Sequence, residues 1–543
     1  MVSYYAIQTP PSDKCIPRSS LKLHPMRSLL AHIVTESPAD SPNLLSGNAR
    51  PVLWLYYAAA SPTLASQAST GWIPINNSAE YRLTWTLDML RRTDYSRLAS
   101  SGETYVDYMG GAIYPESLVK MHTEFLSRHV LGNTHSVSNS SRLSNDCASE
   151  ARDAVLSFFK APPTYTVVFT ANATAALKLV GESFPFSEGS IYVLGMDSHN
   201  SVNGIRQFAT RKGASRILTS QRPINVDQCP SLFALTGQSN ITNSKTSLSI
   251  LEHAALLGYH TLLDASALAA TSTISLQEYP VDAMAFSFYK ICGWPTGVGA
   301  LVVKKSFLSE LQRPWFSGGN VDVVQVPGTV VTRTERLHER FEDGTINYLS
   351  LPAVTEGLRF VSAYLPFLPL RLSCLIHYLI SELSQLHHDN GAPLIRILSR
   401  RPIRRLKSVG EQSDTGSIIS LIFLDPNGDM IPNSFVVYAA SRRRISLRCG
   451  CMCNPGGAAA ILGIQESMAQ LYPSVKLIDF ERAVGRELGV VRISLGLASD
   501  FQDAWNVVQF AASLASQPVR EPATIFTKRV TVQNFIGTVK SLI

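Results

Sequence analysis

The run Ala-Phe-Ser-Phe-Tyr-Lys-Ile-Cys-Gly-Trp-Pro-Thr-Gly-Val-Gly-Ala-Leu-Val-Val, residues 285 to 303, gives the strongest indication of the fold. It places Lys290 between two apolar stretches that are typical of β-strands, with a glycine-rich turn just after the lysine. A lysine held among aromatic side chains is poorly solvated, so its charge is disfavoured and its amine becomes a good nucleophile toward a carbonyl. The alternative is a lysine at a strand end that extends its amine to water.

A second apolar strand is predicted upstream, in Tyr-His-Thr-Leu-Leu-Asp-Ala-Ser (259 to 266), and it ends at Asp264. A carboxylate there is suited to pairing with a protonated pyridine nitrogen. Enzymes that use pyridoxal phosphate need an amine that captures the cofactor's aldehyde and an acid that keeps its ring cationic. The order and spacing of Asp264 and Lys290 therefore predict a pyridoxal phosphate site.

Two earlier stretches supply groups for the rest of such a cofactor. The run Tyr-Thr-Val-Val-Phe-Thr (165 to 170) predicts a strand, and the small residues after it open a helix. Amides at that helix start, with the Thr174 hydroxyl, would receive a phosphate in the field of the helix dipole, although an ordinary capped helix is the alternative. The strand that begins at residue 191 gives way to a loop presenting His199, whose flat ring suits either stacking on a cofactor or capping a helix.

The chain also carries an ordered set of motifs: Tyr-Val-Asp-Tyr-Met-Gly-Gly-Ala (105 to 112), Gly-Asn-Thr-His-Ser (132 to 136), Phe-Thr-Ala-Asn-Ala-Thr-Ala-Ala-Leu-Lys-Leu-Val (169 to 180), Asp-Ser-His-Asn-Ser-Val (197 to 202), Leu-Leu-Asp-Ala (262 to 265), Ser-Phe-Tyr-Lys (287 to 290), Arg-Phe-Glu-Asp-Gly-Thr (340 to 345) and Arg-Cys-Gly-Cys-Met-Cys-Asn-Pro-Gly (448 to 456). This set resembles the aminotransferase-like domain of molybdenum cofactor sulfurase, within the class V aminotransferase and cysteine desulfurase group. The resemblance runs from about residue 85 to about residue 515. It implies the α/β fold type I of pyridoxal phosphate enzymes, with a large domain around a mostly parallel, seven-stranded sheet and a smaller α+β domain.

The resemblance also implies roles at the cofactor. Lys290 would hold pyridoxal phosphate covalently, Asp264 would face the pyridine nitrogen, and His199 would stack on the ring. The phosphate would be held by three residues at one end of the site, namely Ala173, Thr174 and Ser287. Thr345 is similar to a threonine that reaches the phosphate of the neighbouring subunit, which implies a homodimer.

On the substrate side, the resemblance implies that Arg492 pairs with the substrate carboxylate, for which a bidentate guanidinium suits a planar group. Arg448 and Asn133 are further substrate-binding candidates. Cys453 aligns with the cysteine that forms a persulfide. Two positions depart from the pattern: the glutamine that many relatives place near the cofactor's phenolic oxygen is Ala267 here, and the threonine usual within the cysteine motif is Cys449.

The alternating cysteines 449, 451 and 453 are compatible with a metal site, a disulfide or a reactive thiol. A single triplet has no second cluster or spaced histidine pair to complete a tetrahedral site, so no metal is predicted. Alternating residues of an extended chain point to opposite faces, which disfavours a disulfide. Arginines at 442, 443, 444 and 448 would favour a thiolate if they fold nearby, with a solvated edge as the alternative for the first three. Glycines and a proline at 450, 455, 456 and 457 suit a mobile loop.

Composition fits a protein with a large core and small-molecule partners. The 543 residues are 45% hydrophobic and 16% charged, and the 48 basic and 41 acidic side chains are spread along the chain, so no nucleic-acid footprint is present. No stretch reaches the roughly 18 apolar residues of a membrane span, the nearest being 51–65. The first 30 residues are mildly basic, as in a transit peptide, but we expect a cytoplasmic protein because no convincing signal peptide is present.

Four segments are expected along the chain: a weakly patterned extension (1–84), the large domain (85–360), the small domain (361–516) and a tail (517–543). Helical patterns are predicted at 150–159, 247–257 and 370–386, and further strands at 417–424 and 490–495. Molybdenum cofactor sulfurases carry a second, carboxy-terminal domain, and no counterpart is expected within these residues.

Together these features predict a cysteine desulfurase-like sulfurtransferase that takes sulfur from L-cysteine through an enzyme persulfide, with a sulfur-accepting protein or cofactor as partner. The alternatives are a lyase, aminotransferase or epimerase acting on another amino acid, or a non-catalytic relative that serves as an interaction partner. Lys290, Asp264 and Arg492 argue against the non-catalytic alternative.

Overall fold

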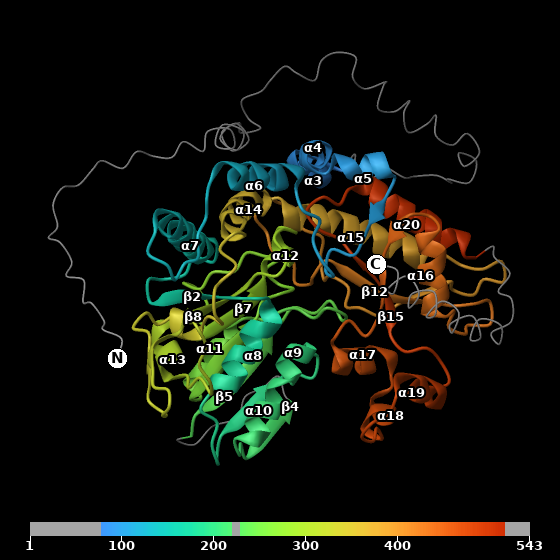
Figure 1. Ribbon diagram of the computed structural model, residues 1–543. Coiled ribbons are helices and arrows are strands. Elements are labelled where there is room, and N and C mark those ends of the chain that lie inside the picture. The colour runs from blue at the N-terminus through green and yellow to red at the C-terminus, as the bar shows by residue number, and fades with distance from the viewer. Residues whose placement is uncertain (1–77, 220–228, 516–543) are drawn as a thin grey trace. The chain divides into compact units, whose positions relative to one another are not determined.

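The computed structural model describes residues 78–219 and 229–515, which include a seven-stranded sheet and a four-stranded sheet (Figure 1). Nearly all of the predicted extension and the whole of the predicted tail lie outside these residues. In spatial order the strands of the larger sheet are β2 (Tyr165–Thr170), β8 (Gly299–Lys304), β7 (Ala283–Ser287), β6 (Tyr259–Asp264), β5 (Ser231–Thr236), β3 (Ile191–Leu194) and β4 (Arg216–Thr219). This sheet confirms the predicted mostly parallel architecture.

The middle strands are parallel and almost completely buried, which explains why they read as continuous apolar runs rather than alternating ones. β5, β6 and β7 are in parallel register, with Thr236 beside Asp264 and Asp264 beside Ala285. The carboxyl ends of these strands therefore meet at one edge of the sheet, where ligands of open α/β sheets bind.

β8 runs antiparallel to both of its neighbours, β7 and β2. Because β7 and β8 are consecutive and antiparallel, the chain between them does not cross the sheet but stays at the carboxyl end of β7. The short helix α12 (Phe288–Ile291) lies in this connection and carries Lys290. The predicted pair of strands on either side of Lys290 is confirmed.

Helices cover the large sheet and follow from the apolar positions of the sequence. α8 (Ala173–Ser183) packs on β7 and β8, while α11 (Ser249–Leu256) packs on β5 and β6. α7 (Asn139–Phe158) packs on β2 and on α14 (Leu351–Tyr364). Short helices α9 (Asn200–Asn203) and α10 (Ile205–Arg211) follow β3, and α6 (Glu116–Arg128) contacts α14.

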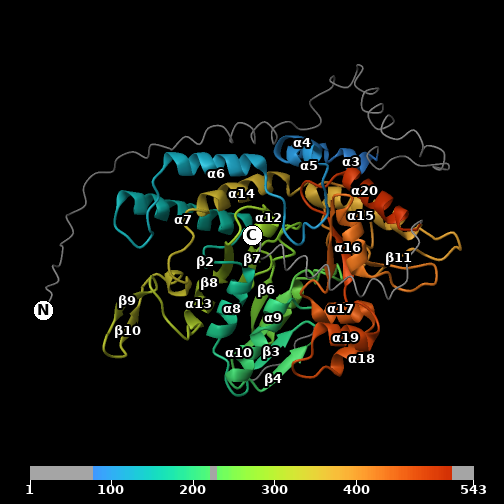
Figure 2. The same ribbon diagram turned by 45° about the vertical axis from the view of Figure 1, so that its right-hand side comes forward.

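The four-stranded sheet is antiparallel in the order β11 (Ile395–Ile397), β12 (Ile418–Phe423), β15 (Val490–Ser494) and β14 (Arg448–Gly450). α15 (Leu368–Ser384) and α20 (Phe501–Ser513) pack together beside it, and α16 (Asn433–Ser441) contacts β12, β14 and β15. α17 (Pro455–Leu462), α18 (Gln465–Ala469) and α19 (Leu477–Val484) form a separate apolar cluster (Figure 2). The α+β character predicted for the carboxy-terminal part is confirmed.

The amino-terminal helices of the described chain lie against these later elements. α3 (Ala79–Arg82) contacts α15, and β1 (Thr104–Tyr105) pairs with β13 (Ile445–Ser446) and contacts α20. The fully buried Arg371 of α15 donates to both carboxylate oxygens of Asp88 in α4 (Trp85–Asp94), at 2.7 and 2.8 Å. The predicted boundary near residue 360 stays a prediction, and the chain before β2 contributes to both halves.

Among the described residues, no single helix is long and apolar enough to cross a membrane. α14 and α15 reach the length and apolar composition of a membrane span only when they are taken together, and this pair is bent by 65° at the break between the two helices.

Candidate active site

A cavity of about 150 Å³ opens at the carboxyl edge of the large sheet. Strand ends and the starts of the following segments supply its walls. The side chains that line it are Asn172, Ala173, Thr174, Leu177, His199, Ser201, Gln238, Asn240, Asp264, Ser266, Ala267, Ser287, Tyr289 and Lys290. The structure thus brings together, around one cavity, all the residues predicted at the cofactor except Thr345.

One end of the cavity is built for an anion. Asn172 caps α8, with its side-chain oxygen accepting the Ala175 amide at 2.9 Å, and the Ala173 amide donates to Ser287 Oγ at 2.8 Å. The Thr174 hydroxyl lies 2.8 Å from that of Ser201. A helix start surrounded by the hydroxyls of Thr174, Ser201 and Ser287, in the field of the helix dipole, is suited to a phosphate.

A glycine permits this close approach of strand and helix. A Cβ on Gly299, the first residue of β8, would lie 2.5 Å from the Cα and carbonyl carbon of Asn172. A side chain at this position would therefore push the start of α8 away from Ser287.

Asp264 and His199 lie at the ring end of the cavity. Asp264 is buried at the end of β6, where one carboxylate oxygen accepts the Ser266 amide at 3.1 Å and the Ser266 hydroxyl at 2.7 Å. His199 caps α9, with Nδ1 accepting the Ser201 amide at 3.1 Å. Because Nδ1 is an acceptor, the ring is neutral, in agreement with burial and Lys290 lowering the pKa of His199 against the opposing charge of Asp264. A neutral flat ring is suited to stacking on a cationic one.

Lys290 is held in a field that suppresses its charge. Burial lowers the pKa of Lys290 most; Asp264 and Cys453 oppose that effect, while Arg492 and Arg448 add to it. An uncharged amine is the form that attacks an aldehyde. The chemistry predicted for Lys290 is thus supported by its surroundings.

Arg492 reaches toward this site from β15 of the small sheet and is only 2% exposed. Its guanidinium donates to Asp107 at 2.6 Å and to the Asn240 carbonyl at 3.2 Å, while Nε has no partner among the described residues. Arg448 lies directly opposite Arg492 on β14 and is exposed. The unpartnered Nε leaves this buried cation with capacity for a further acceptor.

Cys453 is an exposed thiol on a turn in which Met452 and Cys453 both have positive φ angles, 53° and 59°. Its carbonyl accepts the Asn200 amide at 2.7 Å, which ties the turn to the residue after His199. Cys453 also raises the pKa of Lys290 and of Arg492 against the effect of burial, in agreement with a thiol near both cations.

The prediction of a mobile loop is wrong for residues 455 to 457. These residues form the first turn of α17, where a Cβ on Gly456 would meet the Met196 carbonyl oxygen and one on Gly457 would meet the Asp197 carboxylate. Both glycines therefore serve the close contact between α17 and the loop before His199. The buried Asn454 adds to this contact by donating to the Asp197 carbonyl at 3.0 Å.

The arginines near the cysteine motif divide as the two interpretations allowed. Arg448 acts electrostatically on Lys290 and Arg492 and so belongs to the site. Arg442, Arg443 and Arg444 lie exposed at the end of α16, and Arg444 donates to the Ser101 carbonyl. These three form a solvated edge.

Asn133 and Thr345 do not line the cavity. Both are exposed, and the Asn133 amide nitrogen lies 3.3 Å from the Thr345 hydroxyl. Their predicted roles are not fulfilled within one subunit, so both stay predictions.

Several lining residues escaped the sequence analysis. Ser201 and Tyr289 lie within two positions of predicted residues, so their place beside His199 and Lys290 could have drawn attention to them. Gln238 and Asn240 follow β5 in a loop without hydrophobic periodicity, and the strand before them is the only signal. In the described parts of the chain, no group of three or more His, Cys, Asp or Glu lies placed to hold a metal ion.

The fold and the site define a pyridoxal phosphate-dependent enzyme. The residues present fit the cofactor: an anion-binding helix start, a buried carboxylate, a flat neutral ring and a lysine of suppressed charge surround one cavity. Residues 104–389 match the class-V aminotransferase family. The chain belongs to that family.

Relatives of known function are similar to this chain over most of its length. It is 33% identical to the molybdenum cofactor sulfurase of Danio rerio over 76% of this chain and 53% of that protein, and 33% identical to the Homo sapiens sulfurase over 78% and 51%. Against the Arabidopsis thaliana sulfurase the identity is 31% over 80% and 58%. The chain thus spans about half the length of the curated relatives it matches.

Solved structures confirm the fold. A cysteine desulfurase from Thermococcus onnurineus has a TM-score of 0.62 at 20% identity and is covered to 98%, with 79% of this chain aligned. The cysteine desulfurase CsdA from Escherichia coli has a TM-score of 0.60 at 19% identity, with the same shares covered.

Proposed function

We propose that this protein is a cysteine desulfurase-like sulfurtransferase that takes sulfur from L-cysteine and carries it as a persulfide on Cys453. The observation that carries this proposal is an exposed thiol on a turn that is tied to the cofactor cavity, because the Cys453 carbonyl accepts the amide of Asn200, the residue after His199. Transamination, racemisation or simple elimination needs the lysine, the acid and the arginine, but none of them needs a thiol. The sulfurases and desulfurases to which the chain is similar agree with this choice.

The chain's own residues have separate tasks in this reaction. When bound, pyridoxal phosphate would supply an aldehyde that captures the substrate amine and a cationic ring that accepts electrons. Asp264 holds the charge of that ring. Arg492 binds the substrate carboxylate, for which its unpartnered Nε offers a donor. Lys290, whose pKa is lowered by burial, takes the proton from the substrate Cα and returns a proton to the product.

The sulfur step belongs to Cys453. Its thiolate sulfur forms a bond to the substrate sulfur while the Cβ–S bond of the substrate breaks. The electron pair of the broken bond stays on the carbon, which takes up a proton and leaves as alanine. The overall change, a thiol plus cysteine giving a persulfide plus alanine, needs no external oxidant or reductant.

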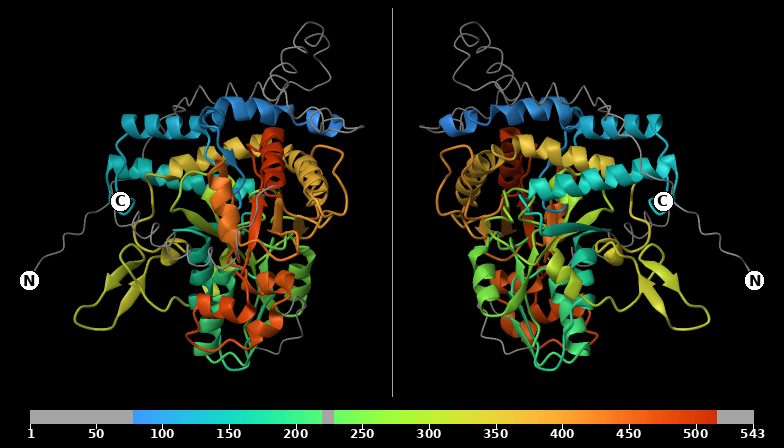
Figure 3. Two further views of the ribbon diagram at one scale, coloured as in Figure 1. Left: turned by 90° about the vertical axis from the view of Figure 1, so that its right-hand side faces the viewer. Right: turned by 90° about the vertical axis from the view of Figure 1, so that its left-hand side faces the viewer.

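We further propose that two copies of this chain form the active enzyme. Thr345 and Asn133 lie together outside the cavity, as expected of groups that serve the site of a partner. Shortly before Thr345 in the sequence, the hairpin of β9 (Val321–Val324) and β10 (Val331–Arg333) stands out from the body of the protein, most clearly in the side views (Figure 3).

The hairpin exposes several large apolar side chains. Val323, Val324, Val326 and Val330 are exposed, with Val326 at 85%, and Trp315 and Phe316 add exposed aromatic surface just before it. A patch of this kind is the mark of a protein–protein contact rather than of a solvated turn. A second copy is the occupant that also explains Thr345. The final sulfur acceptor is a protein or cofactor that meets the exposed Cys453.

A substrate panel tests the function. Purified holoenzyme is incubated with L-cysteine, other L-amino acids and D-cysteine while the cofactor absorbance, sulfide and amino acid products are recorded. The proposal predicts alanine from L-cysteine in step with sulfane sulfur. Pyruvate with ammonia, a keto acid or an inverted amino acid as the main product would identify a lyase, an aminotransferase or an epimerase instead.

A further inference from the structure

Gln238 is an unexplained polar group in the wall of the cofactor cavity. It follows β5 by two residues and is 1% exposed, yet neither its amide nitrogen nor its amide oxygen has a hydrogen-bond partner among the described residues. Buried amides almost always form hydrogen bonds, because a donor or acceptor that is buried without a partner loses its hydrogen bonds to water and gains none in exchange. A buried side chain whose amide nitrogen and oxygen both have no hydrogen-bond partner indicates that a ligand supplies those partners.

The position of Gln238 links it to the cofactor. The amide of Gly237 donates to the Asp264 carbonyl at 3.0 Å, so Gln238 leaves the sheet beside the residues that follow Asp264. Ala267 lines the same cavity, and its side chain carries no polar atom. The cavity wall after Asp264 thus offers no amide at Ala267, while the Gln238 amide beside it has no partner among the described residues.

Gly416 leaves room for the amide of Gln238 in the cavity wall. A Cβ on Gly416 would lie 2.5 Å from the Gln238 amide nitrogen and 2.7 Å from Asn243 Oδ1. Asn243 Oδ1 already accepts the Ile418 amide at 3.2 Å. No hydrogen bond joins Gln238 to Asn243 in the described residues, so the Gln238 amide keeps its capacity for a ligand.

We propose that Gln238 hydrogen-bonds the bound pyridoxal phosphate. This inference rests on the cofactor site described above and goes beyond the proposed desulfurase activity. Gln238 is a cofactor-contacting residue that strengthens binding, and its amide is satisfied only in the holoenzyme.

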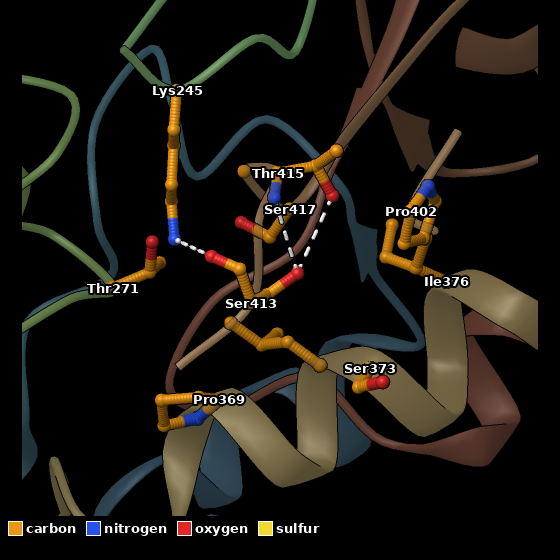
Figure 4. A pocket seen from close by; sticks show the side chains of 11 residues that line it. Lys245, Thr271, Pro369, Ser373, Ile376, Pro402, Ser413, Thr415 and Ser417 are labelled. Carbon is orange, nitrogen blue, oxygen red and sulfur yellow. Dashed lines mark hydrogen bonds between the residues drawn. The ribbon is translucent and has the colours of Figure 1, made fainter. Parts of the chain in front are cut away.

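The test compares Gln238→Leu with a matched control, Thr271→Val. Thr271 also has a buried hydroxyl without a partner, but it lines a separate small cavity beside Lys245 and Ser413 (Figure 4). Holoenzymes are dialysed against a series of pyridoxal phosphate concentrations, and thermal unfolding is followed without and with saturating cofactor. Binding of pyridoxal phosphate to Gln238→Leu should be about fivefold to tenfold weaker, the loss expected for one hydrogen bond, and unchanged in Thr271→Val.

Thermal unfolding supplies the second readout. Without cofactor, Gln238→Leu should be at least as stable as the wild type, because an unmet amide has been removed, and the increase in Tm on adding cofactor should be smaller. Adding Ala267→Gln to Gln238→Leu should restore most of the binding. Should Gln238→Leu not fold, Gln238→Met, which keeps the side-chain length, gives the same comparison.

Wild-type affinity in Gln238→Leu or Gln238→Met would overturn the inference, as would a loss of stability without cofactor that matches the loss with it. The proposed desulfurase activity is judged separately, by alanine release from the wild type. A wild type that binds cofactor but releases no alanine would contradict that activity and leave the Gln238 result standing.

Discussion

At the scale of single residues, the charge of Lys290 depends on its burial and on the ionisable groups near it, among them Asp264, Arg492 and Cys453. Burial disfavours the charge of Lys290, and Arg492 disfavours it further, whereas Asp264 and Cys453 act in the opposite direction. Arg492 keeps its own charge through Asp107, at 2.6 Å, even though burial lowers its pKa. The amine can thus be neutral while the carboxylate-binding cation beside it stays charged.

The first prediction concerns the attachment of the cofactor. Borohydride reduction of the holoenzyme should fix the cofactor to the peptide that contains Lys290, and Lys290→Ala should lose both labelling and turnover. Lys245→Ala is the matched control, since burial lowers the pKa of Lys245 to about 8 but its amine lies outside the cofactor cavity and donates to the Ser413 carbonyl. Labelling of Lys290→Ala would contradict the assignment of Lys290 as the residue that holds the cofactor.

Asp264→Asn tests the acid. This change keeps the shape of the side chain and can keep a bond to Ser266, but it removes the charge that stabilises a cationic ring. We expect the exchange of the substrate α-proton, followed by NMR in deuterated water, to slow by at least about 100-fold while cofactor still binds. Exchange at the wild-type rate would mean that Asp264 does not face the ring nitrogen.

The sequence predicted the residues that follow clear strands, namely Lys290, Asp264 and His199, because buried strands leave a strong apolar pattern. It could not predict Gln238, which lies in a loop without periodicity, or the Asp107 partner of Arg492, which is 385 positions away in the chain. Such partners are fixed by tertiary packing and leave no local signal.

At the scale of elements, the predicted strands and helices agree with the structure to within a few residues at β2, β12, β15, α11 and α15. α7 begins at Asn139, well before the predicted start at Glu150. Its first turns are rich in serine and asparagine, which are more typical of helix caps and turns, so the sequence did not predict a helix there. The antiparallel direction of β8 also escaped prediction, since strand direction is set by the connection and not by the strand's own residues.

Arg91 joins two elements that are far apart in the chain, α4 and α20. Its guanidinium donates to both carboxylate oxygens of Asp503, at 2.6 and 3.0 Å, and Nε lies 2.9 Å from Asp500. Asp500 and Asp503 in turn form the capping box of α20. Arg91 therefore holds the start of α20 against α4.

We expect Arg91→Met to lower the free energy of unfolding by about 3–5 kcal/mol, because it leaves the Asp503 carboxylate buried without its counter-charge. Urea denaturation monitored by circular dichroism measures the change. The neighbouring Arg92→Met is the control, since Arg92 is exposed, and should have little effect. Equal stability of the two variants would show that the pair does not hold α20.

At the scale of the whole molecule, the account predicts a two-fold dimer with the β9–β10 hairpin in its interface. Val326→Asp places a charge on the exposed apolar surface and should shift the protein toward monomer in sedimentation velocity at micromolar concentration, with loss of turnover. Leu256→Asp is the control, because Leu256 is equally exposed, at 85%, but lies on α11. Thr345→Ala should weaken cofactor retention without dissociating the dimer. A fully active monomer would contradict this arrangement.

The transfer of sulfur through Cys453 can be tested by a single labelling measurement. Holoenzyme is incubated briefly with L-cysteine, persulfides are trapped with an alkylating reagent, and tandem mass spectrometry locates the added sulfur among cysteines 449, 451 and 453. The account predicts one extra sulfur on Cys453, lost together with alanine release in Cys453→Ser, while the cofactor absorbance is kept and Cys449→Ser and Cys451→Ser remain active. Full alanine release by Cys453→Ser, or the extra sulfur on another cysteine, would contradict it.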